Sequence, residues 1–317
     1  MRIRILGSAA GGRFPQWNCG CGNCAAVRTG ARDHALKHKF SGQARTQAQL
    51  ALSADHSSWF LAGASPDLPF QIENSAELHP RALRDSPIAG VVLASCDLDH
   101  VVGLLLLREL QPLRIYGAPS ILRILREENS MFGMLNRVEP QALWTALQPD
   151  AAFPLIAADG KDSGLRCDVH YLAGRYPKYV KSAPAKLTNN EATAALFFES
   201  SSPTSSSPKR VAYMPAVGAL NDALLEKIDG ADLLLFDGTF WSDDELRHLQ
   251  GSGETAHDMG HIPVEESLRL LKSITVGRKM YIHLNNTNPI LNEASREYQA
   301  VRAAGWDVAE DNWQLEL

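Results

Sequence analysis

The 317-residue sequence lacks long apolar runs and has no surplus of positive charge. Its most apolar segment, Val101–Leu107, is seven residues long, whereas a helix needs about 20 such residues to cross a bilayer. Lysine and arginine number 31 against 36 acidic residues, so the net charge is −5 and no excess of cations can neutralise phosphates. The first residues, MRIRILGSAAGG, hold too short an apolar segment for a secretion signal. We therefore expect a soluble, cytoplasmic protein that binds neither membranes nor nucleic acid.

Short apolar segments alternate with helical ones along the whole chain, which predicts a layered α/β protein with partly antiparallel sheets. The expected strands are Arg2–Leu6, Gln47–Leu52, Ser58–Ala62, Gly90–Ala94, Leu113–Tyr116, Arg166–Leu172, Ala194–Glu199, Arg210–Met214, Asp232–Phe236 and Lys279–His283.

The sequence predicts two helices and one flexible insertion. His100–Leu110 is apolar nearly all round and predicts a buried helix. A second helix should begin at Pro263, because proline suits a first turn, with Glu265 and Glu266 near its positive end. The segment SSSPTSSSP at 200–208 is typical of a flexible hairpin insertion. With no clear linker elsewhere, residues 1–317 are expected to form a single domain.

Five cysteines are present, and three of them, Cys19, Cys21 and Cys24, are close together. Thiols at this spacing suit one metal ion better than a disulfide framework, so we predict a structural zinc knuckle near 19–24. The alternative is three free thiols in a loop. Cys96 and Cys167 stand alone, and we interpret both as small buried hydrophobic residues.

Acidic and histidine side chains follow three of the expected strands. Ser95-Cys96-Asp97-Leu98-Asp99-His100 comes directly after one strand, Asp237 ends a second and His283 ends a third. Strand ends in α/β proteins face the crevice where ligands bind. For the first segment, the alternative is a helix cap by Asp97 or Asp99 beside a surface histidine. Taken together, Asp99, His100, Asp237 and His283 form a candidate metal site.

This order of motifs resembles the metallo-β-lactamase superfamily and, within it, the family of pyrroloquinoline quinone (PQQ) biosynthesis protein B. The matching segments are GSAAGGRFPQWNCGCGNC at 7–24, ARTQ at 44–47, ASPDL at 64–68, LDHVVGLLLLRE at 98–109, DGTFW at 237–241, MGH at 259–261 and HLNNTNPIL at 283–291. The resemblance implies an αββα sandwich with the metal at one edge between two sheets. The serine-rich insertion and the residues after Trp306 depart from the family's pattern.

The resemblance also implies an activity, namely hydroxylation of the tyrosine ring in a Glu-Tyr-derived precursor by ferrous iron and dioxygen. Other PQQ biosynthesis proteins would then be partners. In the superfamily signature H-x-H-x-D-H, the two first histidines correspond to Ser95 and Asp97 here, which removes the first zinc subsite of a hydrolase. The remaining histidines and carboxylates resemble the two-histidine, one-carboxylate pattern of non-haem iron oxygenases, although zinc commonly binds such donors more tightly.

The catalytic residues that we expect beside the metal are His261 and Asp97. His261 lies in the MGH motif and could shuttle a proton, bind a substrate carboxylate or complete the metal site; the alternative is a loop histidine that caps a helix. For the zinc knuckle, His34, His38 and Asn286 are candidates for the fourth donor. A related phosphodiesterase branch has a histidine at the position of Asn286.

Two other functions compete with the oxygenase. A metal-dependent phosphodiesterase would need a two-metal site, which Ser95 and Asp97 disfavour. A carrier would bind PQQ or an intermediate without catalysis, and a shared fold does not exclude it.

Overall fold

The computed structural model describes residues 1–30, 40–137, 141–180, 189–200 and 208–317. These residues group into two compact units, each of which is described by itself, and the expected single domain stays a prediction. Unit 1 comprises Met1–Leu6, Gln49–Met214 and Asn312–Leu317. Unit 2 comprises Gly7–Ala48 and Pro215–Asp311.

Unit 1 contains a mixed sheet in the order β14-β1-β2-β3-β4-β5-β6. Strands β3 to β6 run parallel, whereas β2 pairs antiparallel with β3 and β1 pairs antiparallel with β14. The short, apolar β4 is buried along its whole length, as strands inside a parallel sheet are. The strands are β1 (Arg2–Gly7), β2 (Gln49–Ser53), β3 (Trp59–Ala62), β4 (Ile88–Val92), β5 (Leu113–Gly117), β6 (Ala142–Ala146) and β14 (Gln314–Glu316).

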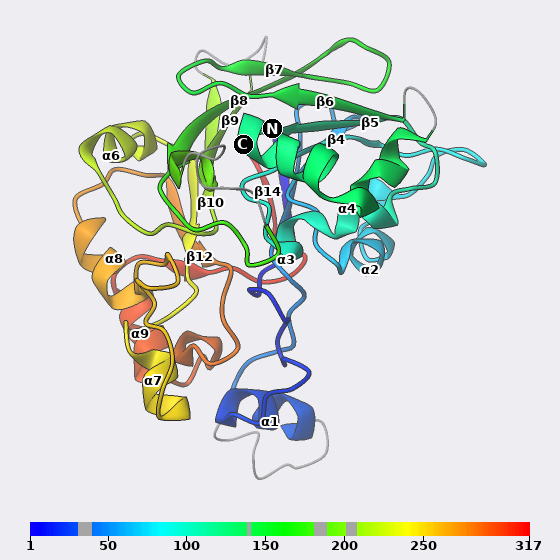
Figure 1. Cartoon of the computed structure of the whole chain (residues 1–317). Coiled ribbons are helices and arrows are strands. Elements are labelled where there is room, and N and C mark those ends of the chain that lie inside the picture. The colour runs from blue at the N-terminus through cyan, green and yellow to red at the C-terminus, as the bar shows by residue number, and fades with distance from the viewer. Residues whose placement is uncertain (31–39, 138–140, 181–188, 201–207) are drawn as a thin grey trace. The chain divides into compact units, whose positions relative to one another are not determined.

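A second, antiparallel group of strands completes the sheets of unit 1, and Figure 1 shows β8 and β9 side by side. These strands are β7 (Phe153–Ile156), β8 (Asp162–Leu172), β9 (Thr193–Ser200) and β10 (Lys209–Met214). Ser200 pairs with Lys209, so β9 and β10 form the expected hairpin. The serine-rich insertion between them lies at 201–207, outside the described residues.

Helices of unit 1 pack on its core, which gathers apolar side chains of β3, β4 and β5. They are α2 (Leu68–Glu73), α3 (Leu98–Val101), α4 (Gly103–Leu106) and α5 (Pro119–Arg123), with 3₁₀- or π-helical segments at 76–78, 124–128, 130–136 and 189–191. The expected helix over His100–Leu110 is wrong in extent and in burial. It is divided into α3 and α4 and ends at Leu106, while Leu106 and Leu110 are exposed.

The reason for this division is a close approach of backbones. The amide of Gly103 donates to the carbonyl of Ala64 at 2.8 Å, and the amide of Ala64 donates to the carbonyl of His100 at 2.7 Å. The turn after β3 is therefore bonded to the backbone of this segment at the point where α3 ends and α4 begins.

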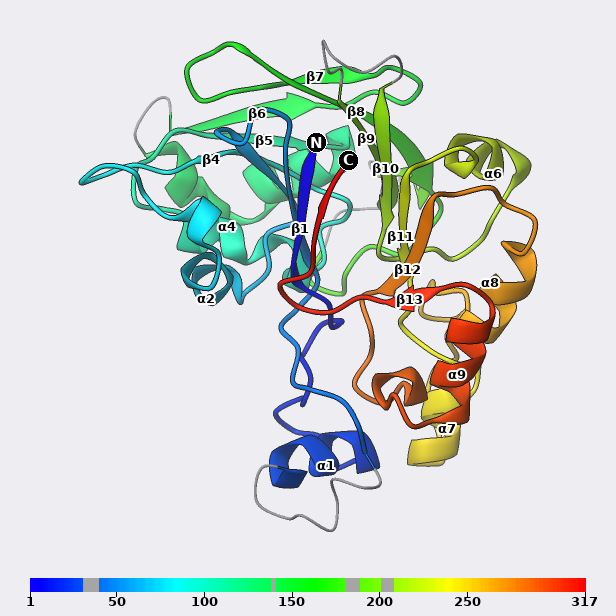
Figure 2. The same ribbon diagram turned by 180° about the vertical axis from the view of Figure 1, so that it is seen from behind.

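Unit 2 contains three parallel strands, β11 (Leu233–Asp237), β12 (Arg278–Ile282) and β13 (Asp307–Val308), which lie side by side with helices beside them (Figure 2). The helices are α1 (Gly22–Gly30), α6 (Asp222–Ile228), α7 (Glu245–Gln250), α8 (Val264–Leu270) and α9 (Arg296–Ala303), with a turn at Pro289–Leu291. Helix α8 occurs where expected, although Pro263 is its N-cap and Val264 its first residue.

Each expected strand is present within a few residues of its predicted bounds, and the α/β expectation is confirmed. The sequence did not predict β6, β7, β13 or β14, which lie at sheet edges. Cys96 and Cys167 are fully buried, as expected. Among the described residues, no helix has the length and apolar character that a membrane crossing requires.

The contact between the turn after β3 and helix α4 generates a first prediction. A methyl group at Gly103 would lie 2.7 Å from the carbonyl carbon of Ala64, so Gly103→Ala should lower the free energy of unfolding by about 1–3 kcal/mol. Gly133→Ala is the matched control, because nothing lies within 4 Å of the added methyl group there. Equal urea midpoints for the two variants would contradict the prediction.

Candidate metal centres

Asp237, the last residue of β11, is fully buried and accepts four hydrogen bonds. Its Oδ1 accepts from the amide of Thr239 at 3.0 Å and from the hydroxyl of that residue at 2.6 Å. Its Oδ2 accepts from the amide of Val217 at 2.9 Å and from Nδ1 of His261 at 2.7 Å. Burial alone would raise the carboxyl pKa, but His261, His283 and these hydrogen bonds outweigh it, so the pKa is lowered. Asp237 is therefore an ionised side chain in a dry environment.

Thr239 connects this carboxylate with two imidazole rings. Its Oγ1 lies 2.9 Å from Nδ1 of His283 and 3.1 Å from Nδ1 of His261. The hydroxyl has one proton, which the 2.6 Å bond assigns to Asp237, so the imidazoles must donate from Nδ1. This network places the proton on Nδ1 of each ring and the lone pair on Nε2, the atom that can bind a metal or accept a proton.

His283 has an unusual backbone conformation directly after β12. Its φ is 60°, in the left-handed region that few residues other than glycine adopt. Hydrogen bonds hold the backbone on both sides, since Gly238 donates to Ile282 at 2.8 Å and Leu284 donates to Ser8 at 2.9 Å. The His283 ring stacks on the His261 ring, with centroids 5.7 Å apart and planes inclined by 22°. Strain of this kind concentrates at functional sites.

Asp237, His261 and His283 each offer a ligand atom within 4.8 Å of the others. Two imidazole nitrogens and a carboxylate oxygen at this spacing suit Zn²⁺ or Fe²⁺. The donor types of unit 2 therefore fit a metal ion, which on binding Asp237 would replace one of the four hydrogen bonds that this carboxylate accepts.

The motif after β4 places His100 in a buried position within unit 1. His100 is 3% exposed, and its Nε2 lies 3.7 Å from Oδ2 of the partly buried Asp99. Gly63, at φ 79°, faces the ring, and a methyl group there would approach Nδ1 of His100 to 3.3 Å. The alternative of a surface histidine is thus wrong for His100.

Ser95 and Asp97 contact each other at the start of this motif. The Ser95 hydroxyl donates to Oδ2 of Asp97 at 3.0 Å, and the Asp97 amide donates to the Ser95 hydroxyl oxygen at 3.2 Å. Asp97 occupies the N-cap position of α3, but its side chain makes no capping hydrogen bond. The capping alternative therefore does not explain this carboxylate.

Tyr213, the penultimate residue of β10, is a polar group that sequence reasoning missed in unit 1. Its hydroxyl is buried and has no hydrogen-bond partner among the described residues. Burial and the nearby Asp99 carboxylate both raise the pKa of this phenol. It therefore stays a neutral hydroxyl near one of the expected ligands.

The cysteine cluster adjoins α1 in unit 2. The sulfur atoms of Cys19, Cys21 and Cys24 lie within 4.8 Å of one another. Nδ2 of Asn286 is 3.1, 3.7 and 3.4 Å from these three sulfur atoms in that order. To bind a metal ion that these sulfur atoms hold, Asn286 would have to present its amide oxygen in place of its NH₂ group. His34 and His38, the other candidates for a fourth donor, lie outside the described residues.

The thiols of this cluster differ in acidity. Burial raises the pKa of Cys24 to about 11. Burial also acts on Cys19, but hydrogen bonds from Cys21 and other neighbours outweigh it and lower that pKa. A metal ion binds thiolates, so occupancy of the cluster requires that Cys24 lose its proton.

The predicted ligands thus fall into both units. Unit 2 brings together Asp237, His261 and His283, while unit 1 holds Asp97, Asp99 and His100. The expectation that Asp99 and His100 share one metal ion with Asp237 and His283 stays a prediction, and so do the catalytic roles of Asp97 and His261.

Sequence reasoning missed Thr239 and Glu245 in unit 2. Thr239 had a signal, because it lies within the quoted DGTFW motif. Glu245 had none, since it follows other acidic residues in a polar segment.

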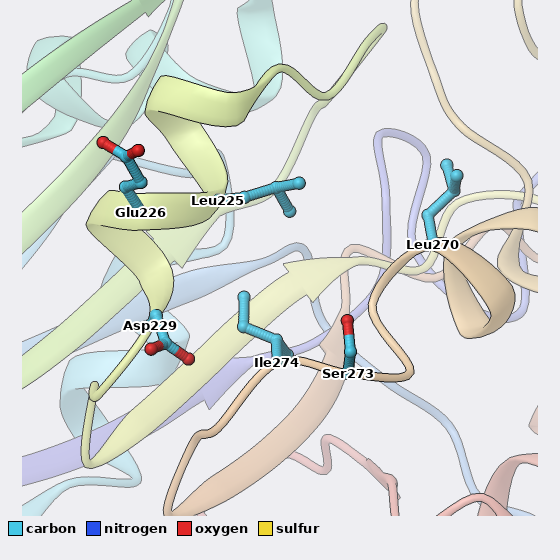
Figure 3. A pocket seen from close by; sticks show the side chains of 6 residues that line it. All are labelled: Leu225, Glu226, Asp229, Leu270, Ser273 and Ile274. Carbon is cyan, nitrogen blue, oxygen red and sulfur yellow. The ribbon is translucent and has the colours of Figure 1, made fainter.

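A surface pocket of unit 2 is shown in Figure 3. Its volume is about 430 Å³. Residues of α6, of the end of α8 and of the turns after them line it: Leu225, Glu226, Asp229, Leu270, Ser273 and Ile274. None of these is an expected ligand, so the pocket does not belong to the candidate metal centres.

The Thr239 network generates a second prediction. Thr239→Val keeps the shape of the side chain but removes the hydroxyl, which leaves buried groups of Asp237 and His283 without this partner. We expect a loss of about 1–3 kcal/mol in unfolding free energy and about 10–100-fold in Co²⁺ affinity. Thr239→Ser keeps the hydroxyl and should retain both. If the valine and serine variants bind Co²⁺ equally well, the hydroxyl does not orient the imidazoles.

Comparisons with known proteins show the family of the chain. The family model described as "Beta-lactamase superfamily domain" matches residues 58–284. "Coenzyme PQQ synthesis protein B" of Rhodopseudomonas palustris (strain TIE-1) is 38% identical over 324 residues and covers 100% of both chains. The protein of the same name from Xanthomonas oryzae pv. oryzae (strain MAFF 311018) is 38% identical over 323 residues, again with 100% of both chains covered.

Among solved structures, Zn(2+)-bound PqqB from Methylobacterium extorquens has a TM-score of 0.87 at 35% identity, over 100% of both chains. A diphosphatase from the PhnP family has a TM-score of 0.66 at 16% identity, covering 100% of this chain and 97% of its own, which shows the fold alone. The fold expected from the sequence is thereby confirmed as that of the metallo-β-lactamases. The chain belongs to the beta-lactamase superfamily and, within it, to the family of coenzyme PQQ synthesis protein B.

Proposed function

We propose that the chain takes part in PQQ biosynthesis, the role that its relatives' name gives to them, as an iron- and oxygen-dependent hydroxylase. The substrate is the tyrosine ring of a Glu-Tyr-derived precursor. The observation that carries this proposal concerns Ser95 and Asp97. They occupy the positions where the superfamily signature has histidines, and their side chains form a hydrogen bond with each other. A serine hydroxyl and a single carboxylate make a poor zinc subsite, which disfavours a two-metal hydrolase.

The metal would be held by Asp99, His100, Asp237 and His283. Imidazole and carboxylate donors suit ferrous iron, and they also bind zinc, the ion in the solved relative from Methylobacterium extorquens. When bound, ferrous iron supplies the redox chemistry that lets dioxygen react with the ring. One oxygen atom enters a ring C–H bond and the other leaves as water, with two electrons and two protons taken from an added reductant such as ascorbate.

His261 is suited to remove the proton of the substrate phenol. Its Nδ1 donates to the buried Asp237 carboxylate at 2.7 Å, which fixes the ring and makes Nε2 more basic. The ring edge of His261 also packs against Phe240, with centroids 5.9 Å apart, so its orientation is set on two sides. Asp97 is the second residue that we assign to catalysis, as an acceptor of a hydrogen bond from the substrate.

The experiment is a single turnover under controlled oxygen. Protein reconstituted anaerobically with ferrous iron is mixed with Glu-Tyr and ascorbate, then exposed to ¹⁸O₂ and analysed by mass spectrometry. We expect one ¹⁸O atom in the dipeptide with wild-type protein and none with His283→Ala or with zinc-loaded protein. Iron-loaded wild-type protein that leaves the dipeptide unchanged contradicts the proposal. Tight, metal-independent binding of PQQ in that case would favour the carrier.

A structural zinc in the cysteine cluster generates a third prediction. We propose that Cys19, Cys21 and Cys24 hold this ion, with the fourth donor left open among Asn286, His34 and His38. Cys21→Ser should release one zinc per chain and lower the melting temperature, because structural zinc binding is coupled to folding. A chelator should lower the melting temperature of wild-type protein but not that of the variant. Full zinc content in Cys21→Ser would show that the cluster is not the site.

The role of His261 generates a fourth prediction. His261→Gln should lower the turnover rate by roughly a hundredfold or more, because the base is lost, while iron affinity is largely kept. His257→Gln is the control, since that exposed histidine contacts Glu266 at 2.9 Å. Normal turnover in His261→Gln would show that this residue has a structural role. A loss of bound iron would show that it is a metal ligand.

A further inference from the structure

Glu245, the first residue of α7, is a buried carboxylate that the proposed reaction does not use. It accepts two hydrogen bonds from two different loops. Oε2 accepts from the backbone amide of Trp241 at 2.7 Å, and Oε1 accepts from the hydroxyl of Thr287 at 2.5 Å. Trp241 lies four residues after Asp237, and Thr287 lies four residues after His283. One carboxylate therefore connects the loops that follow two expected metal ligands.

Further hydrogen bonds join the same two loops. Asn285 donates from its side chain to the Thr287 hydroxyl at 2.5 Å and from its backbone amide to the carbonyl of Thr239 at 3.1 Å. The Asn288 side chain donates to the carbonyl of Gly238 at 2.8 Å. Among these contacts, Glu245 is the charged acceptor. Its bonds are of the charge-assisted kind, which is stronger than a bond between neutral groups.

The direction of these bonds requires a carboxylate and not merely a polar side chain. A backbone amide can only donate, and the Thr287 hydroxyl proton is directed to Glu245 because the hydroxyl oxygen accepts from Asn285. A glutamine at this position would turn its NH₂ group, which can only donate, towards one of the two donors. Burial raises the pKa of Glu245 to about 7, so keeping this group ionised in the fold is costly, and the two donors offset part of that cost.

We propose that Glu245 is a positioning residue that holds the loop after His283 against the loop after Asp237 and thereby sets the affinity of the metal site. This inference rests on the proposed metal at Asp237 and His283. Hydrogen bonds to the groups that carry metal ligands orient those ligands, and their loss commonly weakens metal binding by about 10–100-fold.

The test measures the dissociation constant and visible spectrum of Co²⁺ in full-length protein that holds zinc in the cysteine cluster alone, with His283→Ala as the blank for other sites. The variants are Glu245→Gln, Thr287→Val, their combination, and Thr287→Ser, which keeps the hydroxyl. Glu226→Gln, an exposed substitution of the same type in α6, is the matched control. We expect about tenfold or greater weakening for Glu245→Gln and Thr287→Val, with a changed Co²⁺ spectrum. Thr287→Ser and Glu226→Gln should match wild type.

The double variant separates positioning from general destabilisation. If the two residues act through one hydrogen bond, Thr287→Val should weaken Co²⁺ binding little further in the Glu245→Gln background. Wild-type affinity and spectrum in Glu245→Gln overturn the inference and leave the metal site standing. Identical Co²⁺ binding by wild-type and His283→Ala protein refutes the metal site itself, and the inference with it. Should Glu245→Gln fail to fold, the Thr287→Val and Thr287→Ser pair decides the question.

Discussion

The buried carboxylate of Asp237 is the constraint on which the arrangement of unit 2 depends. An ionised group without exposure to water needs partners for both oxygens, and four donors from three residues supply them. Those donors include Thr239 and His261, and Thr239 in turn holds His283. The register of the parallel strands, in which Asp237 pairs with Ile282, brings these groups together. The hydrogen bonds that stabilise the charge of Asp237 thus also orient the imidazole rings of His261 and His283.

The short segment 283–288 contributes residues to both candidate metal centres of unit 2. It begins with His283, a candidate ligand of the first, and Asn286 contacts all three sulfur atoms of the second. Asn23 of α1 donates to the carbonyls of Asn286 and Asn288 at 3.2 and 3.0 Å, which fastens the cysteine cluster to this segment. A zinc ion there would therefore stabilise the segment that carries His283. Glu245 holds the same segment from another side.

The sequence predicted much of the fold and the residues at strand ends, because a run of apolar residues followed by one acid or histidine is a local signal. Asp237 and His283 were found in this way. Thr239 and Glu245 were not found. Their roles depend on which strands pair and on contacts between loops that are far apart in the sequence. The helix over His100–Leu110 was predicted too long because the approach of Ala64 to Gly103 is a tertiary contact. The edge strand β13 has only two residues, and β6 contains no fully buried residue, so neither has the pattern of a core strand.

The central claim is that one short segment of the chain serves two metal sites of different chemistry. Anomalous X-ray scattering from zinc-soaked crystals, recorded on both sides of the zinc absorption edge, tests it directly. The account predicts two zinc peaks per chain, one bonded to the sulfur atoms of Cys19, Cys21 and Cys24 and one bonded to Nε2 of His283. A peak at the cysteines with none at His283, or a peak at His283 with none at the cysteines, would contradict it.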